Sequence, residues 1–162
     1  MSESDGPQVG PIELRVIPRM RVARVVVRCL PDALWPAVEA AKAAVTVRSR
    51  VAVAGVPIVV FPGLAHEEHV TAEIRVPVSD VAPPIPASDV LPEVTFTRID
   101  RHRAACRTFS GRPGSALARA VDGLFSWVDA NKLGRNGGEH HHVYTPNSEP
   151  RAITMEIRVP VQ

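Results

Sequence analysis

Two nearly identical stretches, "TAEIRVPV" (71–78) and "TMEIRVPV" (154–161), each close a long segment of this 162-residue chain. The similarity extends beyond these eight residues. Glu73 and Glu156 lie 83 positions apart, and the same offset relates three further pairs, namely Phe61 with Tyr144, Gly55 with Gly138, and Leu34 with Leu117. Self-similarity at a fixed offset is typical of a repeated structural unit. The sequence therefore predicts two copies of one unit, with the quoted stretch as the last strand of each.

Each unit has the pattern of an α+β module with the order strand, helix, strand, strand. In the first unit, runs rich in β-branched residues predict an opening strand over 12–17 and 22–29, with a bulge or bend at 18–19, then a helix at 31–45 with Asp32 as its N-cap, and strands at 55–61 and 70–78. In the second, strands are predicted at 93–100, 103–110, 140–144 and 152–161, around a helix at 115–134 that Ser115 caps and Gly134 ends. The expected division of the chain is a disordered N-terminus (1–10), a first module (11–78), a proline-rich linker (79–93) and a second module (94–162).

Composition excludes several classes of protein. Hydrophobic residues make up 45% of the chain and charged residues 22%, which is typical of a soluble globular protein. No uncharged apolar run is long enough to span a membrane, and no signal peptide is visible, so we expect a cytoplasmic protein. The net charge of +2 argues against a large phosphate-contacting surface. Cys29 and Cys106 each lie in an apolar run and are expected to be reduced core residues.

Alternation along the closing strands separates their two faces. Ile157 and its neighbours two residues away form an apolar row that must cover the helix, whereas Glu156 and Arg158 point to the other face. Glu73 and Arg75 occupy the same places in the first unit. This second face is either solvated, with each glutamate paired to its arginine, or forms the walls of a cleft that contains the glutamates. The residues alone leave both alternatives open.

The segments "GLFSWVDANKLG" (123–134) and "VYTPNSEPRAITMEIRVPVQ" (143–162) resemble the GyrI-like small-molecule-binding family, which also supplies effector domains of multidrug-sensing regulators. Leu124, Trp127, Tyr144, Glu156 and Pro160 occupy the family's pattern, and the resemblance covers roughly residues 11–162. It implies tandem modules related by a pseudo-two-fold axis, with a ligand cleft between them. The first unit begins near residue 11, which leaves no room for a helix-turn-helix, so we expect a stand-alone domain without direct DNA or membrane binding.

The resemblance and the chemistry of the side chains together suggest the site residues. Candidate catalytic residues are Glu156, Tyr144 and His142, and candidate ligand-binding residues are Trp127, Trp35, Phe61, Glu73 and His140. Tyrosine can stack and donate a hydrogen bond, tryptophan offers a large apolar face, and a carboxylate can neutralise a cationic ligand. Core or surface roles remain alternatives for both tryptophans and both glutamates. No cofactor and no metal are expected.

His142 departs from the pattern of gyrase-inhibiting relatives, which have an acidic residue two positions before the tyrosine. Strand alternation places His140, His142 and Tyr144 on one face. If the last hairpin turns about "NSEP" (147–150), His142 is expected opposite Glu156, and the two would form an acid/base pair. A metal site is the alternative, but His141 points to the other face and no third ligand is evident.

Some stand-alone members of the family are hydrolases that open the cyclopropane ring of DNA-alkylating natural products. The resemblance therefore implies a hydrophobic, planar ligand and, in its sharper form, hydrolytic detoxification with Tyr144 polarising a carbonyl and Glu156 directing water. The alternatives are a non-catalytic protein that sequesters a drug and a modulator whose partner is DNA gyrase. Because Phe61 and Val59 take the places of Tyr144 and His142 in the first unit, proton chemistry is expected in the second half.

Overall fold

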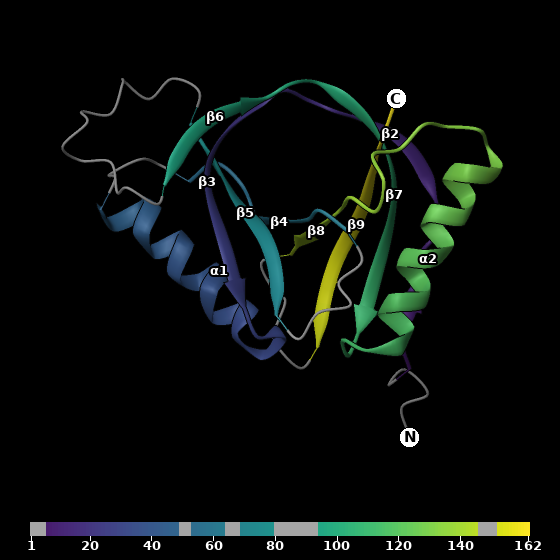
Figure 1. Cartoon of the computed structure of the whole chain (residues 1–162), viewed down its shortest axis with the longest axis horizontal. Helices are drawn as coiled ribbons and strands as arrows, with labels where there is room; N and C mark the ends of the chain where they lie inside the picture. Colours follow the sequence, from purple (N-terminus) through teal and green to yellow (C-terminus); the bar gives the residue numbers. More distant parts are fainter. Residues whose placement is uncertain (1–5, 49–52, 64–68, 80–93, 146–151) are drawn as a thin grey trace.

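The computed structural model describes residues 6–48, 53–63, 69–79, 94–145 and 152–162. They form a nine-stranded antiparallel sheet and two α-helices, so the α+β class is confirmed (Figure 1). The predicted linker and the turn about 147–150 lie almost entirely outside the described residues. Elements in chain order are β1 (Gln8–Val9), β2 (Glu13–Ile17), β3 (Met20–Cys29), α1 (Leu34–Ala43), β4 (Ile58–Phe61), β5 (Val70–Val78), β6 (Thr95–Ile99), β7 (His102–Gly111), α2 (Ser115–Ala130), β8 (His140–Tyr144) and β9 (Ile153–Val161). No helix within these residues is long and apolar enough to cross a membrane.

The two halves of the chain have the same strand pairing. Arg21 of β3 lies opposite Val78 of β5, and Arg103 of β7 lies opposite Val161 of β9. In the neighbouring pair, Ile58 lies opposite Arg75, just as His141 lies opposite Arg158. The repeat thus also relates the registers, with an offset of 83 residues for β4 with β8 and β5 with β9, and of 82 for β3 with β7. The halves meet where β4 pairs with β8 in the middle of the sheet.

The opening strands of the two halves are exchanged, which the sequence pattern did not predict. Strand β2 pairs with β7 of the second half, and β6 pairs with β3 of the first half. Only Pro18 and Arg19 separate β2 from β3. Two-residue hairpins require a primed turn built from residues such as Asn-Gly, and proline cannot donate to a ladder. The chain therefore passes from one half to the other instead of folding back.

The N-terminal segment corrects another expectation. Residues 1–10 were predicted to be disordered, but Gln8 and Val9 form β1 against Ser110 and Phe109 of β7. The Gly10 amide donates to the Thr108 carbonyl at 2.9 Å, which extends the pairing by one residue. For these residues the prediction was wrong, because backbone pairing to an available strand edge stabilises a segment with little hydrophobic character.

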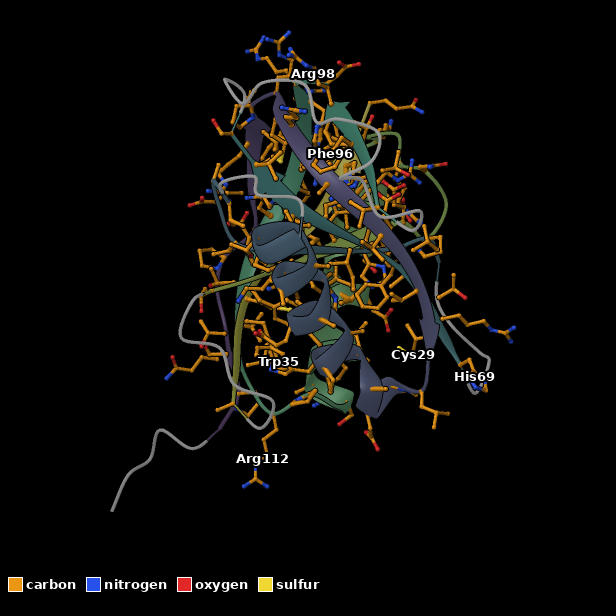
Figure 2. All side chains as sticks on the ribbon, turned by 90° about the vertical axis from the view of Figure 1, so that its left-hand side faces the viewer. Cys29, Trp35, His69, Phe96, Arg98 and Arg112 are labelled. Carbon is orange, nitrogen blue, oxygen red and sulfur yellow. The ribbon has the colours of Figure 1, made fainter. Side chains whose placement is uncertain are left out.

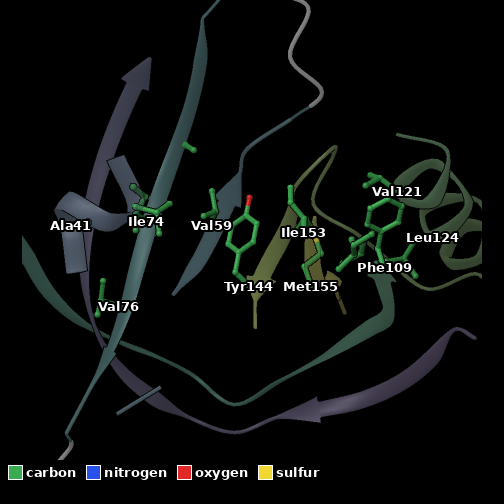
Figure 3. Packing of buried hydrophobic residues seen from close by; sticks show 14 of the residues in the cluster. Ala41, Val59, Ile74, Val76, Phe109, Val121, Leu124, Tyr144, Ile153 and Met155 are labelled. Atoms are coloured by element: carbon green, nitrogen blue, oxygen red, sulfur yellow. The ribbon is translucent and has the colours of Figure 1, made fainter. Parts of the chain in front are cut away.

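The main apolar core lies between the sheet and the two helices, and two smaller clusters of buried apolar residues lie on the opposite face. Alternate residues of β5 and β9 face the main core, as the alternation predicted, and they pack against Val38 and Ala41 of α1 and Leu124 and Val128 of α2. Figure 3 shows Tyr144 in the middle of this layer, between Val59 and Ile153. The helices therefore cover one face of the sheet, and their beginnings border the central strands.

The predicted helix ends were wrong in detail. Helix α1 has Ala33 and α2 has Gly114 at the N-cap, and neither helix has a side-chain capping hydrogen bond, so Asp32 and Ser115 do not cap. Helix α2 ends before Gly134, because Lys132 adopts a φ of 56° and the Leu133 amide donates to the Val128 carbonyl. This is the usual left-handed helix termination, with lysine in the place that glycine normally takes.

The exchanged strand β2 should stabilise the fold through its inward side. Ile17 is 4% exposed and packs with Ala104 and Cys106, whereas its neighbour Val16 is 49% exposed. We expect Ile17→Ala to lower the free energy of unfolding by about 2–4 kcal/mol. Val16→Ala, the matched control on the other face, should change it by less than about 0.5 kcal/mol. Urea denaturation of both variants tests this, and equal losses would contradict the exchanged pairing.

Candidate functional site

A cavity of about 360 Å³ opens on the helix face of the sheet, where α1 and α2 begin. Most of its lining comes from positions related by the sequence repeat. Four such pairs line it, namely Pro31 with Pro113, Leu34 with Leu117, Phe61 with Tyr144, and Val70 with Ile153. Trp35, Asp32 and His142 complete the lining. The cavity therefore lies centrally between the halves and is mostly apolar.

Its floor is a row of aromatic and imidazole rings from β4 and β8. The Phe61 ring stacks on His140 at a centroid distance of 5.1 Å and lies 4.6 Å from His142. Tyr144 follows at 6.4 Å from His142, and Trp35 of α1 meets Tyr144 edge-on at 5.4 Å. The alternation predicted for His140, His142 and Tyr144 is confirmed. Five of the predicted site residues are thus in contact with one another.

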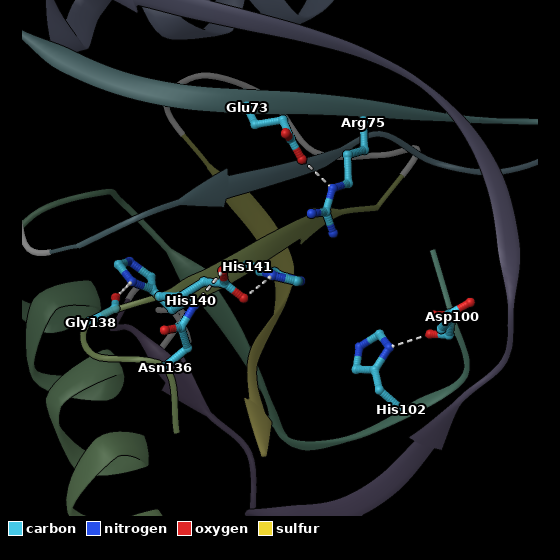
Figure 4. A network of polar contacts seen from close by, with 9 residues as sticks. Glu73, Arg75, Asp100, His102, Asn136, Gly138, His140 and His141 are labelled. Atoms are coloured by element: carbon cyan, nitrogen blue, oxygen red, sulfur yellow. Dashed lines mark hydrogen bonds and ion pairs between the residues drawn. The ribbon is translucent and has the colours of Figure 1, made fainter. Parts of the chain in front are cut away.

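Burial keeps these rings uncharged. It lowers the pKa of His142 to about 3, with smaller contributions from His140 and His141. Burial also lowers the pKa of His140, whose Nδ1 donates to the Gly138 carbonyl at 2.9 Å (Figure 4). The pKa of Tyr144 is raised to about 12 by burial, so its phenol keeps its proton. Near neutral pH the floor therefore offers neutral hydrogen-bonding groups.

One of these groups has no partner. His142 is 6% exposed. Its Nε2 is buried, and no hydrogen-bond partner for this atom is found among the described residues. Unpartnered polar atoms are rare in protein interiors, and those that occur call for an explanation. Because His142 lines the cavity, a molecule in the cavity could supply the missing partner.

The two glutamates lie on the opposite face, so the predicted acid/base pair does not form. Glu156 is opposite Val143, and His142 is opposite Ile157. The predicted register was wrong by one residue, and in a strand such a shift reverses the face of every side chain. The structure therefore separates Glu156 from Tyr144 and His142 by the thickness of the sheet.

Arginines neutralise both glutamates on that face. Glu156 accepts from Arg158 Nε at 2.5 Å and also pairs with Arg15 of the exchanged strand β2. Glu73 pairs with Arg24 at 2.7 Å and also with Arg75. Figure 4 shows the contact between Glu73 and Arg75. The pairing of each glutamate with its arginine, which the sequence left open, is present, although the two side chains are only 21% (Glu156) and 16% (Glu73) exposed. Neither carboxylate is available to the aromatic cavity.

Trp127 is also absent from the cavity lining. It lies on α2, is partly buried and packs against the core. Figure 2 shows the other tryptophan, Trp35, beside α1 at the end of the molecule opposite Phe96 and Arg98.

Sequence reasoning missed Leu34 and Leu117 as cavity residues. The signal that could have found them is the repeat offset, since equivalent positions approach one another near a pseudo-two-fold axis.

Two further cavities border this region. One of about 200 Å³ shares Trp35 and Tyr144 with the central cavity, and its lining includes Glu39 and Lys42, which form an ion pair at 3.5 Å. Another, of about 360 Å³, lies on the opposite face beside Arg158 and Val143 and contains no aromatic ring. Among the described residues no group of three potential ligands is placed to hold a metal ion.

The chain belongs to the GyrI-like small molecule binding domain family, whose model matches residues 60–162. Among curated proteins, no relative matches the sequence. The fold is similar to the EcmrR C-terminal domain, with 17% identity, a TM-score of 0.69, and coverage of 94% of this chain and 98% of that one. The EcmrR chain in a complex with DNA is 15% identical, with a TM-score of 0.74. The match covers 96% of this chain but only 57% of that EcmrR chain.

Two more solved structures have the same fold. A hydrolase from Listeria innocua is 16% identical, with a TM-score of 0.63 and coverage of 93% of this chain and 91% of that one. SAV2435 bound to tetraphenylphosphonium is 10% identical, with a TM-score of 0.59 and 94% coverage of each chain. Identities this low establish the shared fold and leave ligand and activity to be argued from the residues.

The buried histidine should make the fold less stable in mild acid. In the unfolded chain His142 takes up a proton near pH 6.5, whereas in the folded protein its pKa is about 3. The contribution of the neutral His142 to the free energy of unfolding is therefore present above pH 6.5 and is lost as the pH falls. The loss is about 2 kcal/mol by pH 5. Urea denaturation across this range should show a shallower loss for His142→Gln. Identical pH profiles for variant and wild type would contradict the buried neutral imidazole.

Proposed function

We propose that this protein binds a hydrophobic, planar small molecule in the central cavity on the helix face. The observation that carries the proposal is the ring-lined floor, in which Phe61, His142 and Tyr144 lie side by side with one unpartnered nitrogen among them. Ligand sites are typically apolar concavities of about 300–1,000 Å³ with a few convergent polar groups. The cavity, at about 360 Å³, has this size and character.

The comparisons support this proposal. The family is described as one of small-molecule-binding domains, and SAV2435 has been solved with tetraphenylphosphonium, a molecule built of aromatic rings. Trp35 and Tyr144 meet edge to face, and both contribute aromatic surface to the lining of the cavity. Sequestration of a toxic compound needs no more than such a site. Nothing among the described residues favours DNA gyrase as a partner.

Hydrolytic detoxification is the second candidate, favoured by the hydrolase from Listeria innocua with the same fold. In cyclopropane opening, the Tyr144 phenol would donate to the conjugated carbonyl of the drug while water attacks the strained ring. Glu156 would not be the base in this scheme, because it lies on the other face with Arg158. The carboxylate among the described lining residues is Asp32, which is exposed at the cavity edge and would take the proton that the attacking water loses.

Filling the cavity should abolish binding. Leu117 lines the cavity from the first turn of α2, so Leu117→Trp would place an indole in the ligand's space. We expect the affinity for acridone, a neutral planar fluorescent tricycle, to fall at least about tenfold. Leu14→Trp, at a position 41% exposed on β2, is the control and should bind as wild type does. Fluorescence titration measures both, and unchanged binding by Leu117→Trp would place the ligand elsewhere.

Turnover separates the two candidates. The protein is incubated with a large molar excess of a cyclopropane-containing DNA alkylator, and the products are followed by mass spectrometry. For a binding protein we expect about one equivalent of drug to be retained and recovered unchanged. Conversion of many equivalents to the water adduct, lost in Tyr144→Phe and kept in Glu156→Gln, would instead establish the hydrolase.

A further inference from the structure

The charge of the central cavity bears on which molecules it can take, and this argument rests on the proposed function. His140 and His142 are held neutral by burial, and both glutamates lie on the opposite face, paired with arginines. Among the described lining residues the one charged side chain is Asp32, which is exposed at the edge. A cation in the cavity would therefore lose its hydration without meeting a buried carboxylate, which is unfavourable.

The helices add to this effect. Pro113 lines the cavity just before α2, and Pro31 begins a 3-10 helix (Pro31–Ala33, with Asp32 in its first turn) that runs into α1, so both helical segments begin beside the cavity. Neither has a side-chain capping bond, and the first-turn amides of a helix carry a partial positive charge. At α2, whose first turn contains no acidic residue, the positive helix end favours electron-rich groups such as a carbonyl and disfavours a cation.

His142 supplies the matching hydrogen-bonding group. Its Nε2 is buried without a partner, and the ring lies 4.6 Å from Phe61 and 6.4 Å from Tyr144 in the cavity floor. A neutral imidazole presents one donor and one acceptor, so it can bond a carbonyl or amide on a planar ring system. The ring of such a ligand would pack on Phe61 while its polar group met His142.

We infer that His142 is a specificity-determining residue, which selects neutral planar compounds bearing a carbonyl or amide group and excludes lipophilic cations of the same size. This distinguishes the chain from SAV2435, which is seen with the cation tetraphenylphosphonium.

Two probes of equal shape and different charge test the inference. Acridone is neutral and carries a carbonyl, and 10-methylacridinium is a cation with the same three fused rings. Wild type should bind acridone at least about tenfold more tightly than the cation. His142→Leu should weaken acridone binding about five- to twentyfold and leave the cation little changed. His142→Asp should reverse the preference, since it places a carboxylate in the floor.

The neighbouring histidine provides the control. His141 is as buried as His142 but faces the other side of the sheet, where Nε2 lies 3.2 Å from Glu139. His141→Leu should keep the wild-type preference, and circular dichroism verifies folding of each variant. If His142→Asp does not fold, the wild-type preference and His142→Leu still decide.

The possible failures are distinguishable. If Leu117→Trp abolishes acridone binding but His142→Leu leaves it unchanged, or if wild type prefers the cation, the inference is wrong and the proposed function stands. If wild type binds neither probe, or if Leu117→Trp binds acridone normally, the proposed function fails and the inference fails with it.

Discussion

The antiparallel pairing of β4 with β8 is the contact on which the rest of the structure depends. It joins the two halves in the middle of the sheet and sets Val59 opposite His142 and Phe61 opposite His140. Because side chains alternate along a strand, this register places the rings on the helix face. A shift of one residue would turn His142 away from the helices and put His141 in the floor instead. The aromatic cavity and the apolar core on the helix face both require the register observed.

The glutamates of the repeated motif serve the opposite face, and the halves stabilise them differently. Each carboxylate binds the arginine two residues later and one further guanidinium. For Glu73 the second guanidinium is Arg24 of β3, whereas for Glu156 it is Arg15 of the exchanged strand β2. Cys106, which burial keeps in its thiol form by raising its pKa, takes the place on β7 that Arg24 has on β3. Glu156, which the resemblance suggested as an acid that acts on the ligand, thus helps to hold strand β2 to the sheet.

Most of the secondary structure could be predicted, because alternation and the repeat offset are local signals. The strand 70–78 and the start of α2 at Ser115 were found in this way. Two features could not be predicted. The exchange of β2 and β6 is a choice between partners with similar strand patterns, and a pattern does not say which neighbour a strand pairs with. The position of His142 opposite Ile157 depends on the geometry of the turn between β8 and β9, which the residue types in that turn do not determine.

The unpartnered nitrogen has a structural origin in the divergence of the two halves. Val59 and His142 are repeat-equivalent positions, and they also lie opposite each other in the sheet. Residues of this kind sit at the pseudo-two-fold axis, where two identical polar side chains could bond to each other. Here one of the two is valine, fully buried, and it offers no hydrogen bond. The histidine at the axis therefore has no hydrogen-bonding partner in the equivalent position of the other half, and its ring lies in the lining of the cavity.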